Sequence, residues 1–338
     1  MVELMTPDGL RAMPQHFRIN TFDCAPCPQQ GFRIKATLFH VRASIAVTWT
    51  ARNPDERLRA GALVSPRYLG NTLCQNGLIG ISRAVLLDLP DRSLDLFSTV
   101  PPPWVADRSL LARASALWGL LPLPYQELFN GVLWNADRFE RFCNGPGSVS
   151  GHHSEKNGNL RHMVETGEAV LALLPSHRAA HPAIALAAAL LHDVGKADEY
   201  RATERGWVMT DHGKLNGHKQ AIGDWIAVAE SRMRLKLPEA HYLSLRHALA
   251  AAKGVPFESG YRTPKTPEAR LLSLADQSSG SGDLYARQAA ADGGWGLEHH
   301  HLGGEAPFTV LSLPAESGTS SCFPALPRPV AQVWDSPI

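Results

Sequence analysis

The stretch Leu190-Leu191-His192-Asp193-Val194-Gly195-Lys196 decides how this sequence of 338 residues is interpreted. It closes an Ala- and Leu-rich segment, residues 182–194, that is apolar nearly all round and therefore predicts a buried helix. Burying an unpaired carboxylate such as that of Asp193 is costly, and metal coordination is a common remedy. The sequence thus predicts a buried helix that ends in a metal site.

Further histidines and a carboxylate recur around this pair at near-equal intervals. Ten of the 15 histidines lie in residues 152–247. The separations 162→192, 193→218, 218→247 and 247→276 are 30, 25, 29 and 29 residues. Successive helices of a bundle give such spacing when each projects one ligand inward. Four histidines with two carboxylates suit Mn, Fe, Co, Ni or Zn rather than Ca or Mg alone, and Asp193 is placed to bridge two ions. The candidate ligands are His162, His192, Asp193, His218, His247 and Asp276.

The N-terminal third has a different pattern. Residues 31–51 are rich in β-branched and aromatic residues and predict one long or two short strands, and residues 61–64 and 78–81 predict further strands. Short strands broken by Gly, Pro and Asn favour a small barrel or sandwich. Residues 11–67 hold nine Lys and Arg against three Asp and Glu, with Phe32, Phe39, Trp49 and Tyr68 interleaved. This mixture suits single-stranded nucleic acid; the alternative is a compositional preference for Arg with the aromatic residues in the core.

Composition and the remaining segments set the broad class. The net charge of +1 argues against a polybasic protein, and five cysteines do not make a disulfide framework. We expect a cytoplasmic protein, because no apolar run approaches the ~20 residues of a membrane span and the N-terminus lacks a signal-peptide pattern. Helices are expected over residues 160–174, 182–194, 218–235, 239–252 and 266–279.

The ordered set of histidines and aspartates resembles the HD-domain metal-dependent phosphohydrolase superfamily in its two-metal form. More narrowly, the chain resembles YhaM-type 3′→5′ exoribonucleases, which place an OB-fold before the HD domain. The matching segments are residues 150–153 (SGHH), 158–162 (GNLRH), 191–196 (LHDVGK), 213–218 (GKLNGH) and 264–269 (PKTPEA), the last leading to Asp276. HD-type relaxases of conjugative elements share the His-His … Gly-x-Leu-x-His opening and are a competing resemblance.

The resemblance implies a role for each matching residue. The six candidate ligands would hold two divalent transition-metal ions. Asp193 and Lys196 would act in catalysis, with Lys196 contacting phosphate. His152 and His153 would lie at the mouth of the site, bind substrate and, for His153, assist proton transfer. The family usually has a Ser-His-His-Gly-like run after the fourth ligand. Here the stretch is residues 250–254, AAAKG, in which Lys253 would replace one phosphate contact.

We therefore expect an α+β multidomain protein in four segments. Residues 1–103 form an OB-like nucleic-acid-binding unit, 104–148 a helical connector, 149–293 an all-α HD phosphohydrolase domain and 294–338 a peripheral tail. The expected activity is a metal-dependent 3′→5′ exonuclease on single-stranded RNA or DNA that uses metal-activated water. The alternatives are a small- or cyclic-nucleotide phosphohydrolase and a relaxase-like DNA-processing or DNA-binding protein of a mobile element. No membrane partner is expected, and the apolar helices would serve a dimer as well as a monomer.

Overall fold

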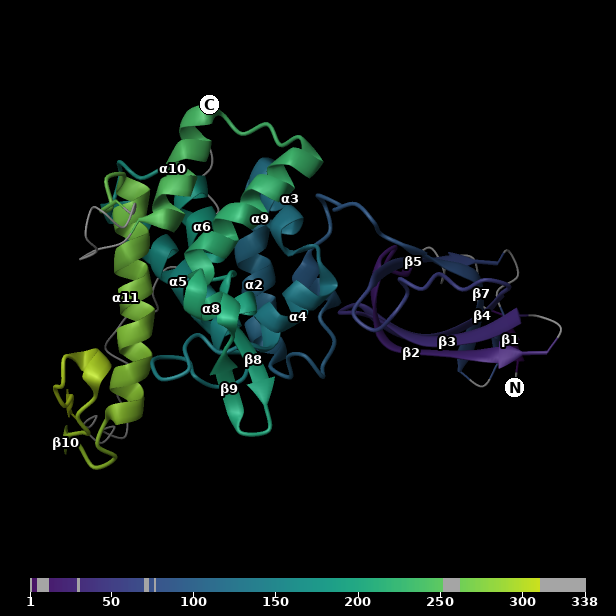
Figure 1. The fold of residues 1–338 in the computed structure, drawn as a ribbon, viewed down its shortest axis with the longest axis horizontal. Helices are drawn as coiled ribbons and strands as arrows, with labels where there is room; N and C mark the ends of the chain where they lie inside the picture. Colours follow the sequence, from purple (N-terminus) through teal and green to yellow (C-terminus); the bar gives the residue numbers. More distant parts are fainter. Residues whose placement is uncertain are drawn as a thin grey trace, which may run out of the picture.

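The computed structural model describes residues 2–4, 12–28, 31–69, 73–75, 77–251 and 262–310. It consists of an N-terminal β-barrel and a larger helical body, which lie at opposite ends of the long axis (Figure 1). The expected order, a β unit followed by helices, is confirmed. Among the described residues no helix is long and apolar enough to cross a membrane.

Five strands close the barrel in the order β2-β3-β4-β7-β5 and back to β2. The strands are β2 (Phe17–Cys27), β3 (Gly31–His40), β4 (Ala43–Ala51), β5 (Leu63–Tyr68) and β7 (Leu78–Leu86), with short β1 (Val2–Leu4) and β6 (Leu73–Gln75) extending the sheet from β7. The β4–β7 pair is parallel, whereas the other pairs around the barrel are antiparallel. This five-stranded closure is OB-like, as expected.

Alternation of side chains along the strands decides which aromatic residues reach the surface. Ile34, Leu38 and Val47 point into the barrel core, and Trp49 joins them with 6% of its surface exposed. On the outer side, the ring of Phe39 lies 5.1 Å from the guanidinium of Arg108. The alternative interpretation, with aromatic residues in the core, is therefore correct for Trp49, which cannot stack on a nucleobase.

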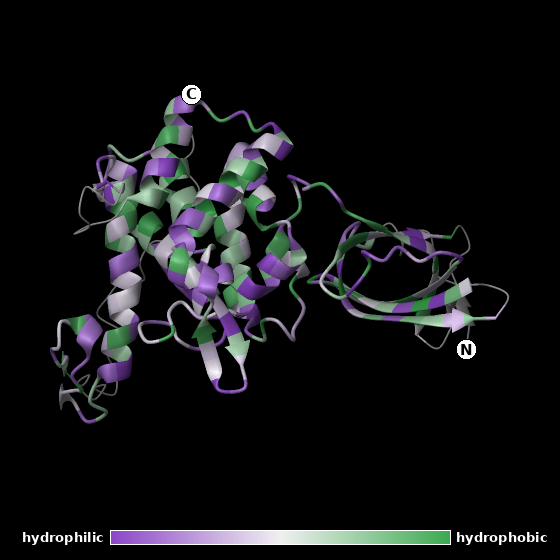
Figure 2. Cartoon of the chain, viewed as in Figure 1, coloured by the Kyte–Doolittle hydropathy of each residue, from purple (hydrophilic) through white to green (hydrophobic). Residues whose placement is uncertain are grey.

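The helical body packs around one central helix. Its elements are η1 (Leu96–Thr99), α2 (Arg108–Gly119), α3 (Leu123–Leu133), α4 (Ala136–Asn144), α5 (Gly158–Leu173), η2 (Leu174–Ser176), α6 (Pro182–Leu191), α7 (Lys196–Glu199), β8 (Tyr200–Thr203), β9 (Gly206–Met209), α8 (Asp211–Leu215), α9 (Gly217–Met233), α10 (Glu239–Ala250), α11 (Pro267–Gln288), β10 (Gly294–Trp295), η4 (His300–Leu302) and β11 (Phe308–Thr309). Residues 183–191 of α6 are all buried. Figure 2 shows hydrophobic residues along the helices at the centre of this body. The five helices expected from the sequence are present, and α11 is longer than expected.

A buried arginine is one of the contacts between the barrel and the helical body, beside the Arg59–Asp137 ion pair. Arg18 of β2 is 1% exposed, and its guanidinium lies 5.0 Å from the ring centroids of both Trp104 and Phe139. Its Nη1 donates to the carbonyl oxygen of Gly61 at 2.8 Å, and its Nε donates to Oγ1 of Thr99 at 3.1 Å. Burial lowers the pKa of Arg18 to about 10. The barrel therefore packs against the body through a specific, dry contact.

Candidate metal centre

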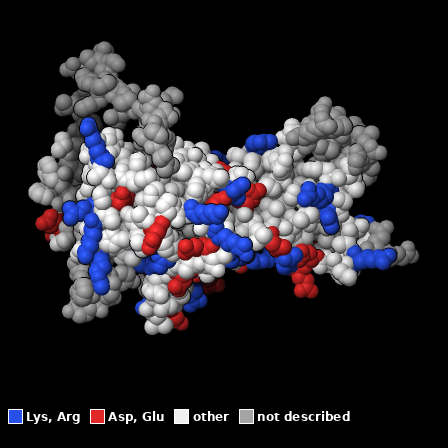
Figure 3. Space-filling view, turned by 90° about the horizontal axis from the view of Figure 1, so that it is seen from above, with Lys and Arg blue, Asp and Glu red and all other residues white. Residues whose placement is uncertain are grey.

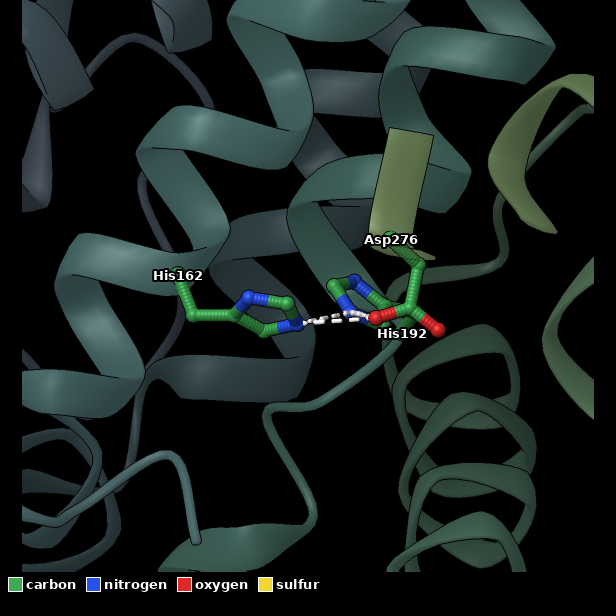
Figure 4. Close-up of side chains that lie close together, drawn as sticks. All are labelled: His162, His192 and Asp276. Atoms are coloured by element: carbon green, nitrogen blue, oxygen red, sulfur yellow. Dashed lines mark hydrogen bonds and ion pairs between the residues drawn. The ribbon is translucent and has the colours of Figure 1, made fainter. Parts of the chain in front are cut away.

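Three side chains from three elements converge beside the end of α6. His162 comes from α5, His192 caps the C-terminus of α6, and Asp276 comes from α11 (Figure 4). Their facing atoms lie within 4.8 Å of one another. Nε2 of His162 is 3.2 Å from Nε2 of His192 and 3.0 Å from Oδ1 of Asp276, and Nε2 of His192 is 3.9 Å from the same oxygen. The site lies where the buried α6 helix ends.

The hydrogen bonds behind the two histidines fix which ring nitrogen carries the proton. Nδ1 of His192 donates to the carbonyl oxygen of Ala189 at 2.8 Å. Ser279 Oγ donates its proton to Glu165 Oε2 at 2.9 Å, so it accepts from Nδ1 of His162 at 3.0 Å. Both Nε2 atoms are thereby assigned as unprotonated, with their lone pairs facing each other and the Asp276 carboxylate. Such a set of acceptors fits a divalent cation, and the outer hydrogen bonds are those that orient metal-binding histidines.

Asp193 lies between this cluster and a third histidine. Its Oδ2 is 3.5 Å from Nε2 of both His162 and His192, and its Oδ1 is 3.4 Å from Nε2 of His218. Oε1 of Glu199 accepts from the backbone N–H of His218 at 2.6 Å and from its Nδ1 at 3.0 Å, so Nε2 of His218 also faces inward without a proton. Asp193 therefore faces the His162–His192 pair with one carboxylate oxygen and His218 with the other.

The electrostatics keep the acidic groups ionised. Burial acts to raise the pKa of Asp193, but the charge of the His192 ring, when that ring is protonated, and the charge of Lys196 outweigh burial and hold the pKa well below its ordinary value. Nζ of Lys196 contacts Oδ2 of Asp193 at 2.5 Å. Burial likewise opposes ionisation of Asp276, yet when Nε2 of His162 carries a proton in the metal-free site, its hydrogen bond lowers the pKa of Asp276 to about 2. Two carboxylates therefore stay charged in a mostly buried site.

A close backbone approach holds the two halves of the site together. A Cβ added at Gly195 would lie 2.3 Å from the carbonyl oxygen of His218, which no real side chain tolerates. The glycine after the His-Asp pair therefore lets the turn that follows α6 touch the first turn of α9. This contact places His218 opposite Asp193.

The structure leaves other candidate residues outside the cluster. Nε2 of His247, at the last turn of α10, accepts from the backbone N–H of Lys265 at 2.9 Å. His153 is 1% exposed, and its Nε2 is 3.1 Å from Oε2 of Glu165, behind His162. His152 packs against the His162 ring, with ring centroids 4.7 Å apart, and burial lowers its pKa to about 3. Lys253 lies outside the described residues.

Three residues of the predicted site, His247, His152 and His153, have surroundings that differ from those expected from the sequence. His247 makes a backbone contact in place of joining the three inward-facing histidines. His152 and His153 lie around the His162 ring, and neither is among the residues that line the described cavity beside the cluster. The spacing of histidines and aspartates along the chain did not indicate Glu165, Ser279 and Glu199, which hold the histidine rings. Glu165 follows His162 by three residues on α5, and Ser279 follows Asp276 by three on α11, so helical spacing could have indicated both.

The His162, His192 and Asp276 cluster lies within a segment of the helical body that is similar to HD domains. Residues 159–280 match the sequence family described as "HD domain". This match supports the HD superfamily, and such domains are typical of metal-dependent phosphohydrolases and bind divalent metals. No curated protein and no solved structure matches the chain significantly.

Proposed function

We propose that this protein is a metal-dependent phosphodiesterase that shortens single-stranded nucleic acid from the 3′ end. The observation that carries the hydrolase assignment is the convergence of the Nε2 atoms of His162 and His192 on the carboxylate of Asp276. When bound there, divalent cations supply charge that neutralises a substrate phosphate and activates water.

The chain's own residues prepare this site. His162, His192, His218, Asp193 and Asp276 would hold two transition-metal ions of the Mn, Fe, Co, Ni or Zn group. The Ser279–Glu165 pair keeps the His162 ring in the orientation that binding needs, and Glu199 does the same for His218. Because these partners are fixed before substrate arrives, little reorganisation is required during the reaction.

The barrel supports a nucleic-acid substrate. In OB-like barrels the face of the second and third strands binds oligonucleotides, which here corresponds to β3 and β4. Arg33 and Lys35 are exposed on β3, and across the sheet they face Thr50 and Thr48 of β4. Basic and acidic side chains are interspersed on the face seen in Figure 3, so no continuous basic surface covers that side. We infer that the barrel binds a strand through a few phosphate contacts on β3.

Degradation of end-labelled strands tests the proposal. The purified protein is analysed for bound metal and then incubated in Mn²⁺ with single-stranded RNA or DNA labelled at the 5′ end. We expect about two ions per chain and a ladder that shortens stepwise, both lost in the double variant His192→Ala/Asp193→Ala. Labelled products that arise from internal cleavage would refute the proposed exonuclease activity. The absence of products from both RNA and DNA would refute it as well.

The contribution of the barrel is tested separately with charge reversal. Arg33→Glu/Lys35→Glu should weaken strand binding and reduce the dependence of affinity on salt, since fewer counterions are released. Arg201→Glu/Arg205→Glu is the matched control, because both arginines are exposed on the β8–β9 hairpin of the helical body. Equal effects of the two double variants would mean that β3 is not the binding surface.

A small-nucleotide phosphohydrolase is the second candidate. A cavity of about 310 Å³ opens beside the cluster, which is at the small end of ligand pockets. Figure 1 places the barrel and α11 at opposite ends of the molecule, so the barrel face does not border this cavity. Hydrolysis of mononucleotides or cyclic nucleotides, with polymers left intact, would favour this function over the exonuclease.

A further inference from the structure

The cavity beside the metal centre is lined by two chemically different kinds of side chain. Charged and metal-binding groups come from the site itself, and small or aliphatic side chains come mainly from α10 and α11. Its lining residues are His192, Asp193, His218, Lys219, Ala248, Leu249, Ala251, Pro264, Ala269, Leu272, Ser273, Asp276 and Gln277. A ligand that uses both kinds of side chain would carry a phosphate and a flat or apolar group.

Lys219 is a lysine of the cavity lining whose side chain is held by two backbone carbonyl groups. It follows His218 in the first turn of α9, and its side chain is half-buried. Its Nζ donates to the carbonyl oxygen of Ala251 at 2.9 Å and to that of Leu249 at 3.1 Å, at the C-terminal end of α10. A lysine ammonium has three N–H donors, so one donor remains for a ligand in the cavity.

Lys196 has a different environment. Its Nζ contacts Oδ2 of Asp193 at 2.5 Å, and it is not among the residues that line the described cavity. Among the described residues that line the cavity, Lys219 is the lysine. An ammonium acts as a point charge for phosphate, and two carbonyl contacts fix its position in advance.

We propose that Lys219 binds the phosphate of a nucleoside monophosphate unit in this cavity, with the nucleoside lying against Leu249 and Leu272. The inference rests on the proposed function and names the part of the substrate that the site takes. Ser273 and Gln277 line the same cavity and offer polar atoms to the edge of a base. The unit is either a free nucleotide or the terminal nucleotide of a strand, because both present the same phosphate and nucleoside.

Binding without turnover separates this inference from the activity. Adenosine 5′-monophosphate, inorganic phosphate and adenosine are each titrated calorimetrically into the Mn²⁺-loaded protein, and Mn²⁺ affinity is measured separately. In Lys219→Met we expect affinity for the monophosphate and for phosphate to fall by about 10- to 100-fold, as for loss of a charged hydrogen bond. Adenosine and Mn²⁺ should bind within about twofold of wild type, and Lys219→Arg should recover most of the phosphate affinity.

Controls distinguish the possible failures. Lys214→Met removes an exposed lysine of α8 that pairs with Asp211 and should change nothing. Unchanged monophosphate affinity in Lys219→Met would overturn the inference, and so would a parallel loss of Mn²⁺ affinity, which would place Lys219 in the metal site. If the wild type binds the monophosphate through Lys219 but shortens no polymer, the exonuclease fails and this binding role stands.

Discussion

Replacing Ser279 by alanine should weaken metal binding although Ser279 is not expected to touch a metal. Ser279 is 7% exposed. Its hydroxyl accepts a hydrogen bond from Nδ1 of His162 and donates one to Glu165. In the variant the Nδ1 proton of His162 has lost this buried partner, which costs about 1–3 kcal/mol. The free protein escapes this cost by moving the proton to Nε2, where Asp276 accepts it at 3.0 Å. Metal binding must reverse that shift, so affinity should fall by about 5- to 150-fold.

Competition with a chromophoric chelator measures this loss directly, with Mn²⁺ or Zn²⁺ as the ion and no substrate present. Ser278→Ala is the matched control, since Ser278 is the exposed neighbour on the same helix. Thermal unfolding of the metal-free variants shows whether both remain folded. If Ser279→Ala binds metal as tightly as Ser278→Ala, the proposed tautomer of His162 is wrong.

Three further predictions concern stability and reactivity. Arg18→Ala should lower the free energy of unfolding by about 3 kcal/mol in urea titrations, because it empties a buried site and leaves the Gly61 carbonyl unpaired; Arg33→Ala, on an exposed position, should cost less than about 0.5 kcal/mol. Burial raises the pKa of the Cys143 thiol, so an alkylating reagent at pH 8 should label Cys143 only in denaturant, as read by peptide mass spectrometry; labelling in the folded protein would contradict its burial. Burial acts to raise the pKa of Glu268. Hydrogen bonds from the His181 backbone and the Ser244 hydroxyl outweigh this effect and lower the pKa below the ordinary 4.5. Its stabilising contribution is therefore present above the unfolded pKa and lost as pH falls through the folded one, so Glu268→Gln should be less stable than wild type at pH 7 and the gap should close in acid. A gap that is independent of pH would exclude this carboxylate as the cause.

The sequence predicted the helices more fully than the strands. Helices α5, α6, α9 and α10 begin and end close to the expected residues because their apolar residues recur at helical spacing. Strand β2 was not expected, since residues 21–27 alternate between exposed and half-buried positions and contain Pro26. The β8–β9 hairpin was also missed, because its residues are mostly exposed and carry no apolar pattern. These segments become strands because they pair with neighbouring strands, and their own residues show little preference for a strand.

Within the candidate site, spacing along the chain located helices but not the rotation of each helix. Equal intervals placed His247 and His218 alike, yet only Nε2 of His218 faces Asp193. Nε2 of His247 instead accepts a backbone N–H, a contact that depends on where the chain before α11 returns to α10. Helical spacing places Glu165 beside His162 and Ser279 beside Asp276, but the hydrogen bond between Glu165 and Ser279 depends on a contact between α5 and α11. Such contacts between distant segments are set by packing.

The candidate metal centre takes its residues from α5, α6 and α11, so metal binding there would depend on the folded state. His162, His192 and Asp276 meet only when these helices are packed, so an unfolded chain offers no comparable site. Any ion that binds there consequently favours the folded protein by mass action, by about 2.7 kcal/mol when the free ion is at 100 times its dissociation constant. A cell depleted of the ion would then lose the protein itself to proteolysis, in addition to losing its activity.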